Sequence, residues 1–150
     1  MESNNHEVRV VIDTNVIISA FISGGKSLNI LDYWKNGDIT LVVSNTILQE
    51  YKDVLSSEKI RNKYKISLFN IDLFIKDIVS ISYFVDDHML KDRPLILSRD
   101  HKDDIFISCA LISNCKYLIS GDKDVLALKN NRLLGKLRII TPSEFISNYP

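Results

Sequence analysis

The chain has 150 residues, 45% of them hydrophobic and 25% charged, and its 19 basic and 19 acidic residues give a net charge of zero. This is the length and balance of one ordinary globular domain, which buries about two-thirds of its unfolded surface. No apolar run approaches the roughly 20 residues that a membrane span needs. The zero net charge argues against a protein that coats nucleic acid by bulk electrostatics.

The first seven residues are polar and contain no apolar stretch typical of a secretion signal, so residues 1–7 are predicted to be a disordered tail. Residues 8–150 contain no repeat and no Pro/Gly/Ser-rich linker, which predicts a single domain. Cys109 and Cys115 lie six residues apart in one apolar segment. On a helix they would point in different directions, so we expect buried thiols of a cytoplasmic protein rather than a disulfide or a metal pair.

The first half of the chain alternates short apolar runs with helical patterns. A β-branched run predicts a buried strand at 8–12, followed by helices at 16–22 and 27–34 and a second buried strand at 39–43. Ser44 or Asn45 then caps a helix that carries apolar residues at helical spacing. Residues 57–81 are predicted to be helical in two pieces, with one apolar stripe formed by Leu68, Ile71, Phe74, Ile75 and Ile78.

The second half continues the alternation. The pattern predicts a short strand at 83–85, a charged loop at 86–102 and a helix at 103–114. A strand at 117–120, a short helix at 125–128, a last strand at 137–140 and a helix opened by Thr141-Pro142 follow. Such an order predicts an α/β fold with a parallel sheet covered on both faces. In these sheets the reactive groups gather beyond the carboxyl ends of the strands.

Acidic residues follow the predicted strands or lie in the helices next to them. Asp13 follows the first strand, Asp122 and Asp124 follow the fourth, Asp104 opens a helix, and Glu50 lies in the helix after the second strand. Each has an ordinary explanation alone, as a helix cap, a turn former or a solvated side chain. Together they would repel one another in one crevice, a cluster that a fold tolerates best when cations neutralise it.

Oxygen ligands select hard ions, so Mg²⁺ or Mn²⁺ is expected. The three histidines show no H-x-x-H spacing and the cysteines no C-x-x-C spacing, which argues against zinc. Ions held by carboxylates commonly activate water and stabilise the oxygens of an in-line displacement at phosphorus. The chain lacks a P-loop and a G-x-S-x-G motif, so phosphodiester hydrolysis is the chemistry that remains.

Four ordered segments resemble the PIN-domain family, in particular its branch of VapC-like ribonucleases, the toxin components of toxin–antitoxin systems. They are residues 10–16 (V-V-I-D-T-N-V), 44–50 (S-N-T-I-L-Q-E), 103–110 (D-D-I-F-I-S-C-A) and 117–124 (Y-L-I-S-G-D-K-D). The resemblance runs from about Val8 to Phe145 and implies a three-layer α/β/α fold with a central parallel sheet.

The resemblance also implies a function and a site. It implies cleavage of single-stranded RNA with Mg²⁺ or Mn²⁺, a homodimer or higher homo-oligomer, and an antitoxin protein as partner. The implied metal ligands and catalytic residues are Asp13, Glu50, Asp104 and Asp122. The implied supporting residues are Thr14, Asn15, Ser120, Asp103 and Asp124. Asp103 and Asp104 are adjacent, and the 18-residue spacing to Asp122 favours Asp104 as the ligand.

Several alternatives remain open on the sequence. The chain could be a catalytically weak PIN-like module that binds RNA or a protein, or a nuclease that prefers DNA. A phosphoryl-accepting receiver domain also has an acidic pocket, but it needs an aspartate after its third strand and a later lysine. The basic stretches at 52–65 and 116–138 fit either a rim that contacts nucleic acid or ordinary solvated helix faces.

Overall fold

The computed structural model describes residues 7–22, 26–92 and 102–148. Five parallel strands form one sheet in the order β3-β2-β1-β4-β5. They are β1 (Arg9–Ile12), β2 (Thr40–Ser44), β3 (Tyr83–Val85), β4 (Tyr117–Ile119) and β5 (Arg138–Ile140). The central strand β1 pairs with β2 through Val10–Leu41 and with β4 through Val11–Leu118. The predicted parallel sheet is confirmed, and each strand lies within two residues of its predicted bounds.

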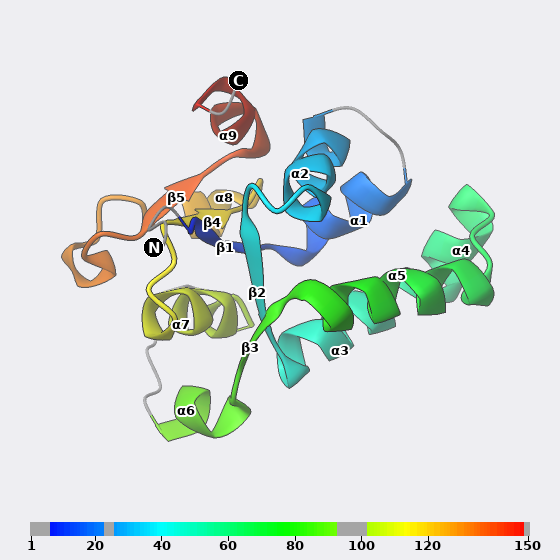
Figure 1. Cartoon of the computed structure of the whole chain (residues 1–150), viewed down its shortest axis with the longest axis horizontal. Helices are drawn as coiled ribbons and strands as arrows, with labels where there is room; N and C mark the ends of the chain where they lie inside the picture. Colours follow the sequence, from blue (N-terminus) through cyan, green and yellow to red (C-terminus); the bar gives the residue numbers. More distant parts are fainter. Residues whose placement is uncertain (1–6, 23–25, 93–101, 149–150) are drawn as a thin grey trace, which may run out of the picture.

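Helices occupy the connections between the strands. They are α1 (Thr14–Ile22), α2 (Lys26–Lys35), α3 (Asn45–Leu55), α4 (Glu58–Tyr64), α5 (Leu68–Ile81), α6 (Asp87–Asp92), α7 (Asp104–Ile112), α8 (Lys123–Leu126) and α9 (Pro142–Asn148), with a 3-10 turn at Arg132–Leu134. Figure 1 shows α7 on one side of the strands and α1, α2 and α9 on the other, while α3 and α5 run outward beside β2 and β3. These layers give the α/β/α arrangement that was expected.

The central strands are buried because their residues face helices on both sides, whereas Tyr83 and Phe84 of the edge strand β3 are exposed. Val10, Val11, Leu41 and Leu118 are fully buried in the core that these layers enclose. This is the environment in which continuous apolar runs, rather than alternating ones, are stable. Among the residues that the structure describes, no helix has the length and apolarity to cross a membrane.

Two predictions about local structure are wrong. The segment 86–102 was expected to be a loop, but it contains α6, whose first turn carries Asp87; residues 93–101 lie outside the described chain. An acid in the first turn stabilises a helix, so the charged character of this segment was misread as irregular structure. Leu68 was assigned to one apolar stripe with Ile71 and Ile78, but it is 50% exposed where those two are buried, because it opens α5 at the end remote from β2.

Two further predictions concern the N-terminal tail and the two cysteines. Residues 1–6 of the predicted tail lie outside the described chain. Glu7 is described, and it accepts a hydrogen bond from Arg9 Nε at 3.1 Å. Cys109 and Cys115 are both free and buried, as expected. Burial raises the pKa of the Cys109 thiol to about 12 and that of Cys115 to about 11, so both thiols are protonated core groups.

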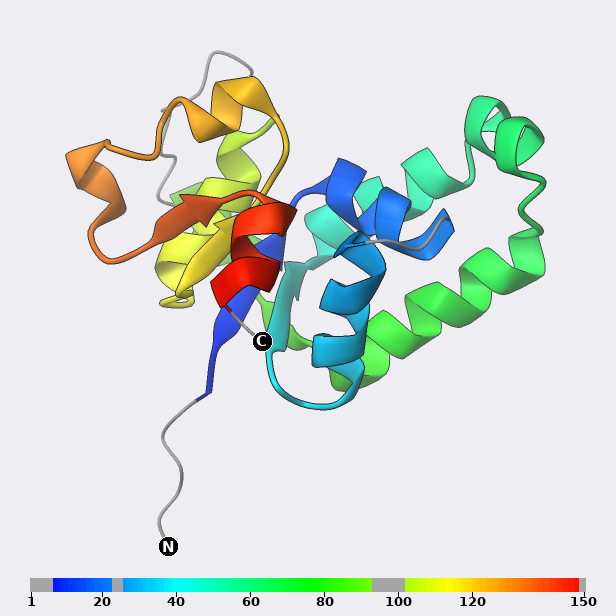
Figure 2. The same cartoon turned by 90° about the horizontal axis from the view of Figure 1, so that it is seen from above.

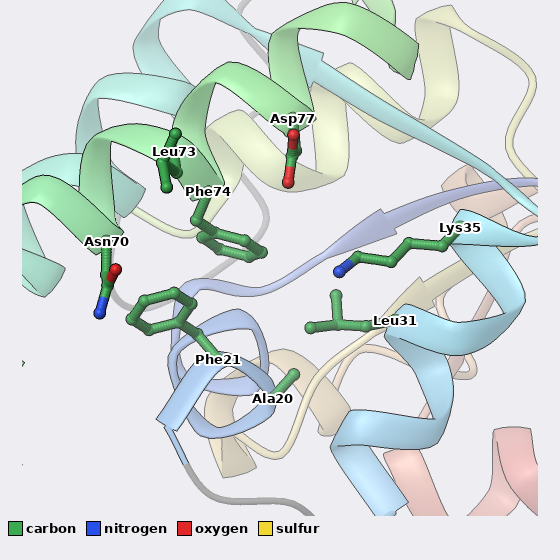
Figure 3. A pocket seen from close by; sticks show the side chains of 8 residues that line it. All are labelled: Ala20, Phe21, Leu31, Lys35, Asn70, Leu73, Phe74 and Asp77. Carbon is green, nitrogen blue, oxygen red and sulfur yellow. The ribbon is translucent and has the colours of Figure 1, made fainter.

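A groove of about 390 Å³ lies between α1, α2 and α5. Figure 3 shows Phe21 of α1 against Phe74 of α5, with Lys35 of α2 and Asp77 of α5 on facing walls. The two phenyl rings lie 4.7 Å apart between centroids and are tilted by 35°. This contact packs α5 against α1, the helix that directly follows Asp13.

Candidate active site

Both carboxylate oxygens of Asp13 accept hydrogen bonds. Asp13 follows the last residue of β1, and its backbone N–H donates to the carbonyl of Ile119 at the end of β4 at 2.9 Å. Its carboxylate is only 7% exposed. Oδ1 accepts from the backbone N–H of Thr14 at 2.7 Å, and Oδ2 accepts from Ser120 Oγ at 2.6 Å. The carboxyl end of the central strand therefore holds one carboxylate in a fixed orientation.

The environment of Asp13 disfavours its charge. Burial raises the pKa of Asp13, and the nearby carboxylate of Asp122 raises it further, while the hydrogen bonds from Ser120 and Thr14 act in the opposite direction. Among the described residues, no lysine or arginine contributes to holding this carboxylate ionised. A buried carboxylate without a cationic side chain beside it is an environment that a bound cation would stabilise.

Thr14 connects Asp13 to Glu50. Its backbone N–H donates to Asp13, and its side-chain Oγ1 donates to Oε2 of Glu50. Glu50 reaches this position because α3 starts at the carboxyl end of β2, where Ser44 Oγ caps it by accepting from the N–H of Ile47 at 3.1 Å. One threonine thus orients a carboxylate that follows β1 and a carboxylate on α3.

Ser120 connects Asp13 to the turn after β4. Its fully buried hydroxyl donates to Asp13 and accepts from the backbone N–H of Asp122 at 3.0 Å. Asp122 Oδ1 in turn accepts from the N–H groups of Asp124 and Val125, at 2.7 and 3.4 Å, and so caps α8. Asp122, for which turn formation was the ordinary explanation, therefore caps α8 through Oδ1, and its Oδ2 lies outside the cap.

The remaining predicted site residues lie at the starts of helices. Asp104 opens α7 and is 8% exposed, and α7 packs on β1, β2 and β4. Asp103 precedes it, is half-buried, and caps α7 without a side-chain hydrogen bond to the helix. Asn15 and Asp124 are exposed on the first turns of α1 and α8.

The donor chemistry of this network fits a hard divalent cation, because every candidate ligand is a carboxylate oxygen. Within the described ranges, however, no three acidic, histidine or cysteine side chains converge closely enough to hold one ion. The side chains that do meet are Asp13 with Glu50, through Thr14, and Asp13 with Asp122, through Ser120. The network is therefore a set of linked carboxylates around Asp13 rather than a closed coordination shell.

Beside Glu50 lies an open hollow of about 410 Å³. It is lined by residues of α3 and α6, namely Asn45, Thr46, Gln49, Glu50, Asp53 and Asp87. The backbone N–H of Thr46 donates to Asp87 Oδ1 at 3.3 Å, which ties α6 to the start of α3. Solvent and ligands can therefore approach Glu50 from this side.

Tyr51 supports the site but was not among the predicted site residues. Its fully buried hydroxyl donates to the carbonyl of Ile12, the residue before Asp13. Burial, and secondarily the carboxylate of Asp13, raise the pKa of Tyr51, so its proton remains available for this bond. The spacing of Ile47, Tyr51 and Leu55 marks the buried face of α3, but it carries no sign that this hydroxyl reaches β1.

The fold and the site define a PIN-type nuclease scaffold. The family model of the PIN domain matches residues 9–124, so the chain belongs to the PIN-domain family. This membership supports the predicted class of protein, a nuclease. The chain is 32% identical over 149 residues to the uncharacterized protein MJ1680 of Methanocaldococcus jannaschii, and the match covers 95% of this chain and 92% of that protein.

Two solved structures share the fold. One is a chain of VapBC2 from Rickettsia felis, crystallised with a DNA fragment from its promoter, with a TM-score of 0.54 and 17% identity over 89% of this chain and 98% of that one. The other is PAE2754 from Pyrobaculum aerophilum, with a TM-score of 0.54 and 11% identity over 94% of each chain. The predicted family and fold class are therefore confirmed.

Proposed function

We propose that this protein is a metal-dependent endoribonuclease that cleaves phosphodiester bonds of single-stranded RNA. The observation that carries the proposal is the pair of links from Asp13, through Thr14 to Glu50 and through Ser120 to Asp122. Hydrogen-bonded side chains that fix acidic ligands are the usual second layer around a catalytic ion. A chain that needed Asp13 only as a helix cap would not require two further acids joined to it.

The acidic residues would have distinct tasks. Asp13, Glu50, Asp104 and Asp122 would hold Mg²⁺ or Mn²⁺, which when bound lowers the pKa of water and stabilises charge on phosphate oxygens. Thr14 and Ser120 donate to these carboxylates and keep their oxygens in position. Asn15 and Asp124, both exposed, lie where they could contact the RNA backbone or water beside the ion, and Asp103 would support Asp104.

Membership of the family supports a proposal about the biological setting. We propose that the protein acts in the cytoplasm as the toxin of a toxin–antitoxin pair and is restrained by an antitoxin protein. The support is membership of the PIN-domain family together with the fold shared with a chain of VapBC2, which was crystallised as a complex. A homodimer or higher homo-oligomer is part of the same proposal.

A second candidate is a catalytically weak PIN-like module that binds RNA or a protein. The specific observation in its favour is that no three potential ligands converge on one point within the described part of the chain. If metal binding fails to draw these carboxylates together, the same fold serves only as a binding surface. Calorimetric titration with Mn²⁺ separates the candidates, because the module would bind the ion weakly or not at all.

The decisive experiment is cleavage of end-labelled single-stranded RNA by the purified protein with Mn²⁺, Mg²⁺ or EDTA. Cleavage is expected with either ion and not with EDTA, and Asp13→Asn and Glu50→Gln should reduce it at least about a hundredfold. Asp72→Asn is the matched control, because it removes an exposed acid of α5 that lies outside the site and outside the hollow beside Glu50.

The outcomes distinguish the possibilities. Equal activity of wild type and both site variants would indicate a contaminating ribonuclease and contradict the proposal. A parallel assay with single-stranded DNA of the same sequence tests the preference for RNA, and faster cleavage of DNA would overturn that part alone. Circular dichroism of each variant excludes loss of folding as the cause.

A further inference from the structure

Helix α4 projects from the body of the protein. Both views place it at the edge of the molecule, beyond the outer ends of α3 and α5 and away from the sheet (Figures 1 and 2). None of its residues is buried. Ser57 caps its first turn by accepting from the N–H of Ile60 at 3.4 Å. The helix therefore contributes little to the core, and its exposed side chains are free to serve a partner.

The exposed side chains of α4 and its flanks are basic. Residues 57–66 contain four basic residues, namely Lys59, Arg61, Lys63 and Lys65, and one acidic residue, Glu58, in a chain whose net charge is zero. The three lysines are exposed and Arg61 is half-buried. Positive charge is thus concentrated on one protruding element, which fits an anionic partner.

Arg61 and Lys63 lie in the last turn of α4, where basic side chains favour the helix, but two features of these charges act against its stability. Lys59 and Lys63 stand four residues apart on one helix face, where like charges repel. Lys65 ends the helix in the left-handed region, with φ of 54° and ψ of 47°, which glycine or asparagine adopts with less strain. Lys65 therefore adds a positive charge at a position where its backbone conformation is less favourable than that of glycine.

Aromatic rings lie among these charges. Tyr64 is 42% exposed, and Phe69, in the first turn of α5, is 70% exposed. Lys63 Nζ lies 5.2 Å from the centroid of the Tyr64 ring. Lysines that contact phosphates, alternating with open aromatic faces on which bases stack, are the combination that binds single-stranded nucleic acid without reading its sequence.

We propose that Lys59, Lys63, Tyr64, Lys65 and Phe69, called here the α4 surface, bind single-stranded RNA outside the site of cleavage. The inference rests on the proposed ribonuclease function and adds a second contact region for its substrate. Helix α3 joins the two regions, since Glu50 lies in its middle and α4 begins three residues after its end. The surface would hold the RNA segment that flanks the cleaved bond.

The test measures binding of fluorescently labelled poly(U) by anisotropy, in EDTA and in the Asp13→Asn background, so that cleavage does not interfere. The variant Lys59→Gln/Lys63→Gln/Lys65→Gln should weaken binding roughly 10- to 100-fold near 0.1 M salt and reduce the slope of log K against log salt by ~2. Tyr64→Ser and Phe69→Ser should each weaken binding about tenfold with little change in that slope.

The matched control is Lys76→Gln/Lys129→Gln/Lys136→Gln, which removes three exposed lysines outside the α4 surface. An equal loss of affinity in this control would mean that the α4 surface holds RNA no better than basic residues elsewhere on the protein, and would overturn the proposal. Equal binding of labelled poly-glutamate would assign the surface to an acidic protein instead. A changed oligomeric state of Phe69→Ser, measured by light scattering, would assign it to contacts between copies of the chain.

The two proposals can fail separately. Metal-dependent cleavage by the wild type with unchanged poly(U) binding in the lysine variant would leave the ribonuclease function standing and remove the α4 surface. Loss of binding in the lysine variant, together with no cleavage by the wild type, would leave the α4 surface standing and remove the ribonuclease function. No binding of poly(U) by the wild type would overturn the α4 surface directly.

Discussion

Asp13 combines deep burial with a negative neighbour, and this combination costs folding stability. Its side chain is 7% exposed, and burial together with Asp122 raises its pKa. The hydrogen bonds from Thr14 and Ser120 hold the ionised form in place but do not neutralise it. Residues that destabilise a fold while being held firmly by it are typical of functional sites.

We therefore expect Asp13→Asn to be more stable than the wild type at neutral pH in EDTA. Because the folded-state pKa lies above the ordinary value of 3.8, the native protein holds the Asp13 proton more tightly than the unfolded chain. The wild type therefore loses stability as pH rises from 3.8 through the folded pKa, and the asparagine variant lacks this loss.

The measurement is Tm as a function of pH for both proteins. The difference should be largest near neutral pH and vanish below pH 3.8, where Asp13 is protonated in both states. Added Mn²⁺ should raise the Tm of the wild type alone and narrow the gap. An asparagine variant that is less stable at neutral pH would mean that the carboxylate serves the fold rather than a ligand.

Sequence reasoning located single residues unevenly. Asp13 was predicted because it directly follows a β-branched run that suits a buried strand, and Ser120 because the segment 117–124 resembles the PIN-domain family. Tyr51 was missed because its bond to the carbonyl of Ile12 depends on how α3 packs against β1, 39 residues away in sequence. Contacts of this kind depend on tertiary packing, which local patterns do not encode.

At the scale of elements, α3 connects the sheet to the site. Ser44 is the last residue of β2 and the cap of α3, so one residue fixes both the end of the strand and the start of the helix that carries Glu50. Ser67 caps α5 in the same way, accepting from the N–H of Asn70 at 3.1 Å, but α5 carries none of the predicted site residues.

This pair of caps makes a controlled prediction. Ser44→Ala and Ser67→Ala should each lower the free energy of unfolding by about 1 kcal/mol, equivalent to a drop of ~2–4 °C in Tm. Only Ser44→Ala should also lower the rate of RNA cleavage, because only this cap orients Glu50. Thermal unfolding and the cleavage assay, run side by side, check both parts; an equal effect on cleavage would show that α3 does not position the site.

Elements were predicted well where strong local signals agree with the tertiary structure. The two pieces of the 57–81 helix and the cap at Ser44 follow from serines that cap the helices. Helix α6 was missed because its short charged sequence has no apolar period, and its formation depends on Leu90, which is only 7% exposed. The burial of Leu90 is a tertiary contact, and the local sequence pattern does not show it.

At the scale of the whole molecule, the PIN-domain match ends at residue 124 but the core does not. β5 pairs with β4, and Phe145 of α9 is fully buried. Its ring packs edge-on against Tyr33 of α2 at 5.6 Å and against Tyr117 of β4 at 6.0 Å. The C-terminal segment therefore closes the core from the side of α2, and that residues 8–150 form one domain stays a prediction.

If these residues form one cooperative unit, damage at Phe145 should destabilise all of it. Phe145→Ala should lower the free energy of unfolding by about 3–5 kcal/mol and Tm by about 10 °C, because it leaves a cavity between α9, α2 and β4. Phe69→Ala is the matched control: the same substitution at a ring that is 70% exposed should change stability by less than about 0.5 kcal/mol.

The single tryptophan, Trp34, is 2% exposed on α2 and reports on the neighbourhood of Phe145. Its fluorescence and the circular dichroism signal of the whole chain should change in one coincident transition in wild type and variant. A Trp34 transition that precedes the loss of helicity would mean that α2 and the C-terminal segment unfold separately from the rest, and would contradict the single domain.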